Sequence, residues 1–444
     1  MITFLPSIFS WQSLPLTKPR RIFSLSSATM LVIASMVGTG VFTTLGFQAA
    51  AVPDGAALLL LWAFGALVAL CGALSYAELA ASLPRSGGEY HFLSQLYHPV
   101  LGRLAGLVSL TVGFSAPVAL AAMAFGRYGS HLLPLPPMVL ALGVLSLVTV
   151  FHLARAEIGQ GFLVGTTLLK ILVSLGFALL ALAAGAVPGS LSPWPTQATW
   201  DWVLSAPFGL SLIYVSYAYG GWNAAVYVVD EVQAPEKTVP KALAYGTLGV
   251  AVLYLLLNLA FLRTIPLETL QGTLEVGALS ATQLFGAVGG QLLSFMLCLL
   301  LLSSISALVV TGSRVLQIMG EDLPLLKPFR AANAGGSPAR AILLQQGLAA
   351  GLILTNSFED VLTFAGFTLS LFASLTVAGV FLLRRREPQG HRPFFLPLYP
   401  LPPLVFLGFN LFALGAAFWE RPVPVAGVFL MLILAGVLLR PRNA

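Results

Sequence analysis

The chain has 444 residues with a formal net charge of +6, and 9% of its residues are charged while 58% are hydrophobic. A soluble domain carries about 25% charged residues, and a chain this apolar could not cover its hydrophobic surface in water. These values exclude a water-soluble enzyme and a disordered scaffold, and the small, scattered positive charge excludes a nucleic-acid-binding protein.

The first segment, residues 1–25, is predicted to be a cytoplasmic tail in front of a membrane domain. Its basic residues Lys18, Arg20 and Arg21 follow the apolar part of the segment, which is the reverse of the order in a secretory signal. A small-residue cleavage site is also missing after them. We therefore expect this tail to lie on the cytoplasmic side, against the membrane surface.

Twelve apolar stretches follow the tail, and each is long enough to cross a bilayer as a helix of about 20 residues. Proline and glycine breakers separate most of them, whereas only the polar pair Asn356-Ser357 separates the ninth from the tenth. We therefore predict an all-α membrane protein with 12 transmembrane helices. The predicted spans are residues 26–48, 55–82, 100–127, 134–152, 159–186, 203–230, 240–263, 277–310, 339–356, 359–383, 400–418 and 421–440.

The lysine and arginine residues orient these spans, because cytoplasmic segments of membrane proteins carry an excess of both. With the N-terminus inside, 18 of the 22 fall on inner segments, and only Arg127, Arg263 and Arg421 fall on outer ones. The remaining one, Lys170, lies within a span. This distribution predicts a multi-pass protein of the cell (inner) membrane with both termini in the cytoplasm.

The first and sixth spans carry glycines at mid-depth, Gly38 and Gly40 in the first and Gly220 and Gly221 in the sixth. Close helix packing explains either motif alone equally well, because small residues are common where membrane helices touch. The two spans nevertheless occupy corresponding places in two halves of five spans. Such a pair of interrupted helices indicates a transporter site between structural repeats.

An interrupted membrane helix has a definite binding chemistry. It exposes amide N–H groups at one half-helix and carbonyl groups at the other. The N–H end carries the positive end of the helix dipole and suits a carboxylate, while the carbonyl end suits an ammonium group. Because a zwitterionic amino acid presents both groups a short distance apart, the two breaks predict an amino acid site.

Three stretches give the sequence a family resemblance, and two weaker ones lie at residues 311–315 and 366–388. The three are the broken-helix motif at residues 37–42, the stretch from Ser75 to Tyr90, and the stretch from Tyr217 to Leu243. Over residues 26 to about 410 the sequence resembles the amino acid–polyamine–organocation (APC) superfamily, most closely the amino acid permeases of its L-type transporter branch. The resemblance implies a LeuT-type fold with broken helices 1 and 6, in which residues 26–186 and 203–383 form inverted repeats and residues 400–440 are peripheral.

The same resemblance implies roles for individual residues in the two breaks. Amides of the first break would bind the substrate carboxylate, and carbonyls of the second would receive its amine. Tyr217 stands where the L-type branch usually has a gating phenylalanine, and Asn223 matches a polar position that supports the unwound segment. The implied substrate-binding residues are Val37, Gly38, Thr39, Gly40, Tyr217, Ala218, Tyr219, Gly220 and Asn223.

Lys170 is the one charged residue deep inside a span, so its burial, which costs about 3 kcal/mol on insertion scales, needs a reason. In the resembling family a lysine at this position lies beside the first break, where sodium-coupled relatives bind sodium. Burial disfavours the charged form of an amine, so Lys170 is the candidate for proton coupling or for a fixed charge that stabilises the break in an exchanger. Ser303 and Ser304 of the eighth span are expected to offer hydroxyl groups to it.

Charged residues also gather at the inner ends of the spans, among them Glu78, Arg85, Glu89 and Glu231. Solvated helix caps account for them as well as a functional role does. The functional alternative is a cytoplasmic gate of ion pairs that closes in one state of alternating access and opens in the other. The resemblance favours the gate for the stretch from Glu78 to Glu89.

These observations predict a secondary active transporter of neutral L-amino acids that works by alternating access with proton-linked symport. An amino acid exchanger is the alternative, and so is a polyamine or organic-cation carrier, although such carriers tend to place acidic side chains in the pocket. An enzyme is not expected, since all five histidines fall at or beyond helix ends. No cofactor, metal or nucleic acid is expected as a partner, and the loop from Arg127 to Pro137 has no cysteine for a disulfide-linked ancillary subunit.

Overall fold

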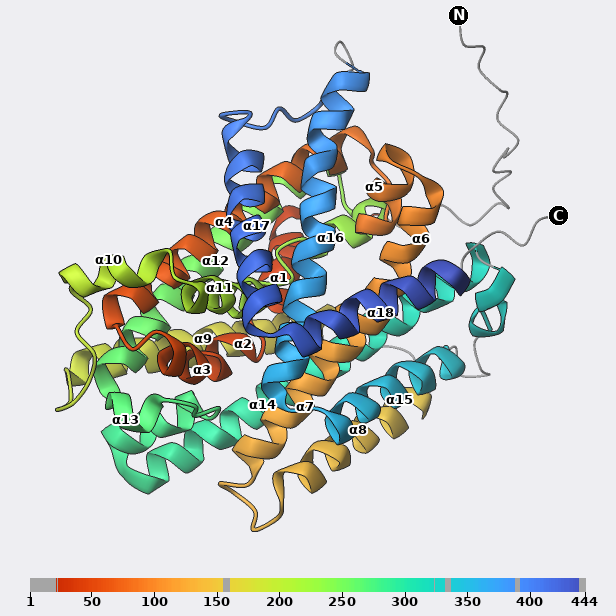
Figure 1. The fold of residues 1–444 in the computed structure, drawn as a ribbon. Coiled ribbons are helices and arrows are strands. Elements are labelled where there is room, and N and C mark those ends of the chain that lie inside the picture. Colours follow the sequence, from red (N-terminus) through yellow and green to blue (C-terminus); the bar gives the residue numbers. More distant parts are fainter. Residues whose placement is uncertain are drawn as a thin grey trace, which may run out of the picture.

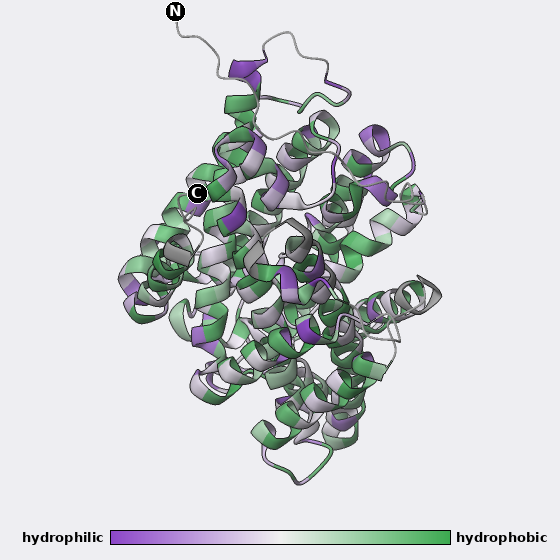
Figure 2. Cartoon of the chain, turned by 90° about the vertical axis from the view of Figure 1, so that its right-hand side faces the viewer, coloured by the Kyte–Doolittle hydropathy of each residue, from purple (hydrophilic) through white to green (hydrophobic). Residues whose placement is uncertain are grey.

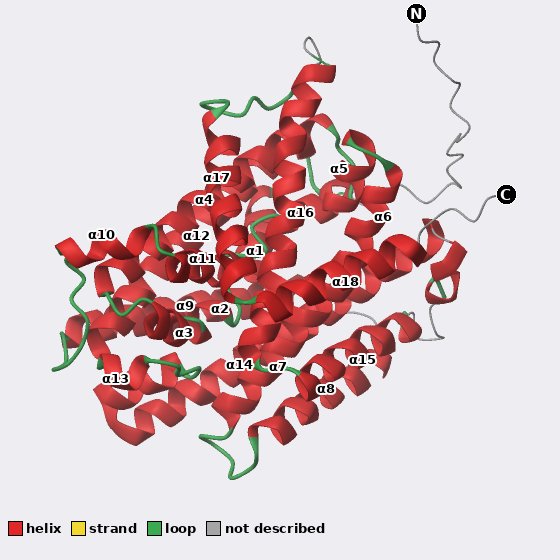
Figure 3. Cartoon of the chain, viewed as in Figure 1, coloured by secondary structure: helices red, strands yellow, loops and turns green. Residues whose placement is uncertain are grey.

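The computed structural model describes Arg21 and residues 23–154, 160–322, 324–331, 337–387 and 392–438. Within this part of the chain the long elements are all helices (Figure 3), and extended backbone pairs only in two isolated bridges. The elements are α1 Leu25–Met36, α2 Gly40–Thr43, α3 Leu45–Ala51, α4 Gly55–Ser82, α5 Gly88–Leu96, α6 Pro99–Val108, η1 Ser109–Ser115, α7 Ala116–Gly129, α8 Pro137–Ala154, α9 Gln160–Ala184, α10 Gln197–Val203, α11 Ala206–Ala218, η2 Ala224–Glu231, α12 Pro235–Thr264, α13 Leu267–Leu270, α14 Val276–Asp322, η3 Pro324–Phe329, α15 Ala339–Thr355, α16 Phe358–Arg386, α17 Leu401–Glu420 and α18 Pro422–Leu438.

The helices fall where the apolar stretches predicted them. Among the described residues, 9 helices are long and apolar enough to cross a membrane. Three shorter apolar helices, in α11, α15 and α18, coincide with the predicted sixth, ninth and twelfth spans. The all-helical class is therefore confirmed, and some bounds agree to the residue, since α4 begins at Gly55 and ends at Ser82.

Apolar residues predominate along these helices (Figure 2), and many of them are exposed. Leu147 of α8, Leu172 of α9 and Val288 of α14 expose 62%, 67% and 76% of their surface. Exposed apolar surface of this extent marks contact with a membrane or with another protein rather than with water. The structure thus agrees with the composition in assigning the lipid bilayer as the solvent.

An aromatic cluster holds α4, α12 and the middle of the sixth span together. The rings of Trp62, Tyr219 and Tyr254 lie 5.1 to 5.9 Å apart, centroid to centroid. Aromatic pairs in such geometries add about 0.5–1.5 kcal/mol beyond the burial of their surface. Around this cluster α12 packs against α1, α4 and α9, and α11 packs against α4, α16 and α17 (Figure 1).

Both predicted breaks are present in the structure. The first span is helical to Met36, is interrupted by bends over residues 37–39, and resumes as α2 at Gly40. The sixth span ends as α11 at Ala218, turns over residues 219–223, and continues as the 3₁₀ helix η2. Gly221 has a φ of +97°, a conformation that side chains with a Cβ disfavour.

Two other irregularities were not predicted. The third span contains the π-helical segment η1 between α6 and α7, and α14 is interrupted at Gly286, whose φ is +71°. The helix α14 also runs on to Asp322, beyond the predicted end at residue 310. Its added turns bury Leu316 and Met319 in a small apolar cluster with Leu326 of η3, which explains why the helix continues.

The predicted cytoplasmic tail lies mostly outside the described residues, which begin with Arg21 and Phe23. Phe23 donates its amide to the Glu231 carbonyl at 3.0 Å and accepts from the Gln233 amide at 2.9 Å. The chain therefore enters its first helix against the segment that follows η2. Both segments belong to the end of the fold where the inner loops were predicted.

Candidate functional site

The two breaks lie against each other. A Cβ added to Gly40 would lie 2.5 Å from the Cα atom of Ala218, and a Cβ on Gly221 would lie 2.6 Å from the Ser35 carbonyl oxygen. Both distances are too short for a side chain, so glycine is required at these two points of contact. The structure thereby brings together the substrate-binding residues predicted in the first and sixth spans.

Tyr254 of α12 joins the two helix ends that stop at the breaks. Its hydroxyl donates to the Met36 carbonyl at 2.6 Å and lies 3.2 Å from the Ala218 carbonyl oxygen, and the Gly38 amide faces it. These carbonyls belong to the last residues of α1 and α11. Sequence reasoning missed Tyr254. A phenol in the middle of the apolar seventh span needs a buried polar partner, so its position in the sequence could have indicated a role at the site.

The amides at the start of α2 are available to a ligand. Those of Thr39 and Gly40 donate to no carbonyl or side chain in the part of the chain that the structure describes. Gly38 borders open space, because a Cβ placed on it would approach nothing closer than the Met36 carbonyl at 3.9 Å. This corner can therefore accept an anionic group at the positive end of a helix dipole.

On the side of the sixth span, Tyr217 faces the same corner. Its hydroxyl lies beside the Thr39 hydroxyl, and Tyr217 is only partly buried. The Tyr217 carbonyl accepts from the Gly220 amide at 2.8 Å, and a carbonyl has a second lone pair for a further donor. By contrast, the Tyr219 side chain turns away and bonds the Trp62 carbonyl at 3.3 Å.

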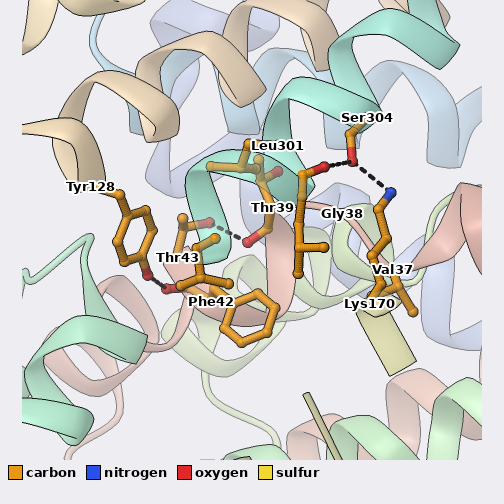
Figure 4. A pocket seen from close by; sticks show the side chains of 11 residues that line it. Val37, Gly38, Thr39, Phe42, Thr43, Tyr128, Lys170, Leu301 and Ser304 are labelled. Atoms are coloured by element: carbon orange, nitrogen blue, oxygen red, sulfur yellow. Dashed lines mark hydrogen bonds between the residues drawn. The ribbon is translucent and has the colours of Figure 1, made fainter. Parts of the chain in front are cut away.

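Lys170 of α9 reaches the first break, as predicted. Its amine donates to the Ser304 Oγ of α14 at 2.8 Å, and that hydroxyl donates to the Leu300 carbonyl at 3.0 Å (Figure 4). The lysine is 4% exposed and takes part in no salt bridge among the described residues. It is therefore a buried cation whose described partner is neutral.

A small cavity lies between Lys170 and the break (Figure 4). Val37, Gly38 and Thr39 border it together with Lys170 and Ser304, whereas Ser303 does not. Its volume of about 10 Å³ for the centre of a water molecule suffices for one water and no more. This cavity is therefore too small to hold an amino acid.

Of the four predicted gate residues, Glu78 forms a buried ion pair. Both of its oxygens accept from Arg384 of α16, at 2.8 Å from Nε and 2.6 Å from Nη2, and the Leu396 amide donates at 2.9 Å. The carboxylate is fully buried, so the two charges stabilise each other in a medium of low dielectric. Sequence reasoning had assigned no gate role to Arg384, the partner that the fold supplies.

Glu89 is held differently, by neutral donors. It accepts hydrogen bonds from the Tyr76 hydroxyl at 2.9 Å, from the Asn223 amide at 2.6 Å, and from the Tyr227 hydroxyl. None of the salt bridges of the described residues includes Glu89, because α5 turns the carboxylate inward toward the sixth span. Asn223 supports the unwound segment as expected, through this bond.

The remaining two gate residues flank this region. The Glu231 carbonyl accepts from Phe23, while its side chain appears in none of the salt bridges of the described residues. Arg85 lies near His91 of α5, and burial together with this arginine lowers the pKa of His91 to about 4. That histidine is therefore neutral at physiological pH.

Among the described side chains, no group of three or more His, Cys, Asp or Glu residues could hold a metal ion. The two cysteines, Cys71 and Cys298, are buried and free.

The chain is similar to a known family and to individual relatives along most of its length. Residues 23–439 match the family described as Amino acid permease. The serine/threonine exchanger SteT of Bacillus subtilis is 27% identical over 425 residues, covering 92% of this chain and 94% of the relative. The human cystine/glutamate transporter is 26% identical, with coverage of 94% and 84%, and the human Asc-type amino acid transporter 1 is 27% identical, with coverage of 93% and 80%.

Proposed function

The chain belongs to the amino acid permease family, and from this premise we propose that it carries neutral L-amino acids across the cell membrane by alternating access. The observation that carries the proposal is the contact of the two breaks. There Gly40, whose amide and that of Thr39 are free among the described residues, lies directly against Ala218 at the carbonyl end of α11. An amino acid carries a carboxylate and an ammonium group on one carbon, and these suit the amides of the first break and the carbonyl end of α11 respectively.

Neutral substrates are favoured by the side chains around the breaks. The cavity beside the first break is lined by apolar and hydroxyl groups, with Lys170 as its charged residue. An acidic group that would select a polyamine or another organic cation is missing from this lining. The predicted polyamine carrier is therefore the weaker alternative.

For energy coupling we propose proton-linked symport with Lys170 as the group that gains and loses the proton. A lysine with a serine as its described partner can lose its proton without leaving a carboxylate unpaired. Exchange is the second candidate, because one relative that aligns along nearly the whole chain is named a serine/threonine exchanger. In an exchanger the fixed charge of Lys170 would stabilise the first break.

The proposed architecture has 12 transmembrane helices, with repeats over residues 26–186 and 203–383 and peripheral helices over residues 400–440. The ion pairs support it, because each joins helix ends that this topology places on one side of the membrane. These are Glu78 with Arg384 on the inner side, and Arg127 with Glu275 and Glu359 with Arg421 on the outer side. In this proposal Glu78, Arg85, Glu89 and Glu231 belong to the inner gate.

The orientation is tested by cysteine labelling. A cysteine replacing the exposed Arg385 should react with a membrane-impermeant thiol reagent from the cytoplasmic side alone, and one replacing the exposed Gln197 from outside alone. Background labelling should be low because Cys71 and Cys298 are buried. Labelling of both positions from the same side would contradict the topology.

Transport itself is tested in proteoliposomes with a panel of labelled amino acids. We expect counterflow of neutral L-amino acids, and accumulation when a pH gradient drives protons in the same direction. Decarboxylated amines and amino acid amides should compete poorly, because they lack the group that binds the amides of the first break. Accumulation that needs an internal amino acid and ignores the pH gradient would establish exchange in place of symport.

A further inference from the structure

The helix α16 begins with a group of charged residues that neither the gate nor the substrate site uses. Glu359 in its first turn accepts from the Tyr214 hydroxyl at 2.9 Å and pairs with Arg421. Asp360 lies 3.8 Å from the same arginine, and Ser357 caps the helix by accepting from the Asp360 amide at 3.1 Å. Glu359 therefore binds Tyr214 by a hydrogen bond and Arg421 by an ion pair at the same time.

Glu359 and its neighbours contact the outer halves of both broken spans. Tyr214 belongs to α11, the outer half of the sixth span, and Thr363 of α16 also reaches its hydroxyl at 3.4 Å. Phe47 of α3, in the outer half of the first span, stacks on Phe358 with ring centroids 6.0 Å apart. The start of α16 thus covers the two segments that must move if the site opens outward.

Arg421 connects this group to the last two helices. It lies between α17, which ends at Glu420, and α18, which begins at Pro422. About a third of its side chain is exposed, and Glu359 is 24% exposed, so water screens the pair only in part. Glu359 therefore links α11, through Tyr214, to Arg421, which lies in a part of the fold outside the proposed repeats.

The other end of α16 is also held by charge. Arg384 in its last turn forms the buried pair with Glu78 of α4. A single helix therefore carries one ion pair at each face of the membrane. In alternating access the outer path and the inner path open in turn, so contacts of this kind must be released one at a time.

We propose that Tyr214, Glu359 and Arg421 form an outer latch, which keeps the external path closed and is released when the protein opens outward. This inference rests on the proposed alternating access and adds to it the residues that control the external side. The latch closes one path while the Glu78–Arg384 pair closes the other. Weakening either contact therefore shifts the protein toward the state in which that contact is absent.

The test uses a cysteine at Ser216, a partly exposed residue in the last turn of α11, in a background with Cys71→Ser and Cys298→Ser, and labels it with a membrane-impermeant thiol reagent. Glu359→Gln should raise the rate of labelling from outside by about tenfold, the change that corresponds to 1.4 kcal/mol. It should lower labelling from the cytoplasmic side. Arg384→Gln should do the reverse, with faster labelling from inside.

Glu275→Gln is the matched control, since it breaks another outer ion pair, with Arg127, that involves neither α16 nor Tyr214. It should leave both labelling rates unchanged. The reversed pair Glu359→Arg with Arg421→Glu should return the rates toward those of the unmodified protein, which a variant that merely misfolds would not do.

Two results separate this inference from the function it rests on. If amino acid transport is normal but Glu359→Gln labels like the control, the latch is overturned while the proposed function stands. If no amino acid is transported but labelling from outside still rises and reverses with the charge swap, the latch stands and the proposed substrate class fails. If labelling became equally faster from both sides, this would also overturn the latch, because it would indicate a general loosening of helix packing.

Discussion

Replacement of Lys170 by alanine is expected to abolish accumulation driven by a pH gradient. The Lys170 amine is nearly fully buried, bonds Ser304 at 2.8 Å and borders the break of the first span. A hydrogen bond from a charged donor contributes about 1.5–3 kcal/mol, so losing the bond to Ser304 should also weaken the support of the first break and lower substrate affinity. Uptake measured against internal and external pH in proteoliposomes gives both quantities.

Lys170→Arg separates the two proposed roles of the lysine. Arginine stays protonated under all accessible conditions, so it can supply a fixed charge but cannot cycle a proton. If Lys170 couples transport to protons, the arginine variant should accumulate substrate no better than the alanine variant. If the lysine only stabilises the break, arginine should retain part of the exchange activity.

Neighbouring serines provide a control for this experiment. Ser304→Ala removes the described partner of Lys170, whereas Ser303→Ala changes the adjacent hydroxyl, which does not line the cavity. We expect Ser304→Ala to shift the pH dependence of uptake and Ser303→Ala to leave it unchanged. An unaltered pH dependence in Lys170→Ala would remove the lysine from the coupling mechanism.

Local patterns were sufficient to predict the helices and the breaks. Runs of apolar residues determine membrane helices because every backbone polar group must be satisfied within the segment. Glycines such as Gly40 and Gly221 mark the breaks because the other half of the site approaches too closely for a Cβ. A functional role of Lys170 was also predictable, because a charged residue inside a membrane span is costly to bury and usually marks a functional site.

Partners from distant parts of the chain were not predictable in this way. Nothing near Glu78 in the sequence identifies Arg384, and nothing near Met36 identifies Tyr254. These contacts depend on which helices pack together, and the apolar pattern that predicts a span does not state its neighbours. The inward turn of Glu89 has the same origin, since it depends on Tyr227 and Asn223 of the sixth span.

The two glycines of the first break are expected to respond differently to the same small substitution. Gly40→Ala would place its Cβ 2.5 Å from the Cα and Cβ atoms of Ala218, neither of which can rotate away. The half-helices would have to separate, so this variant should lose both thermal stability and transport. Valine at this position should be at least as damaging, because of the contact with α11 rather than the contact with substrate.

Gly38→Ala, by contrast, should fold normally and still impair binding. Its Cβ would meet nothing nearer than the Met36 carbonyl at 3.9 Å, so the fold has room for it. The same methyl would occupy the space beside the free amides of Thr39 and Gly40, where the substrate carboxylate is proposed to bind. The KM for neutral amino acids should therefore rise by at least about tenfold, a loss of 1.4 kcal/mol, while the melting temperature stays unchanged.

Gly143→Ala is the control, since this exposed glycine of α8 has no neighbouring atoms within 4 Å of an added Cβ. Alanine is favoured over glycine in a helix by about 0.5–1 kcal/mol, so this variant should be slightly more stable and should transport normally. Uptake kinetics and thermal melting of the three variants distinguish the explanations of the glycine motif. If the motif served helix packing alone, Gly38→Ala would bind amino acids as well as Gly143→Ala does, because the space it fills would belong to no ligand.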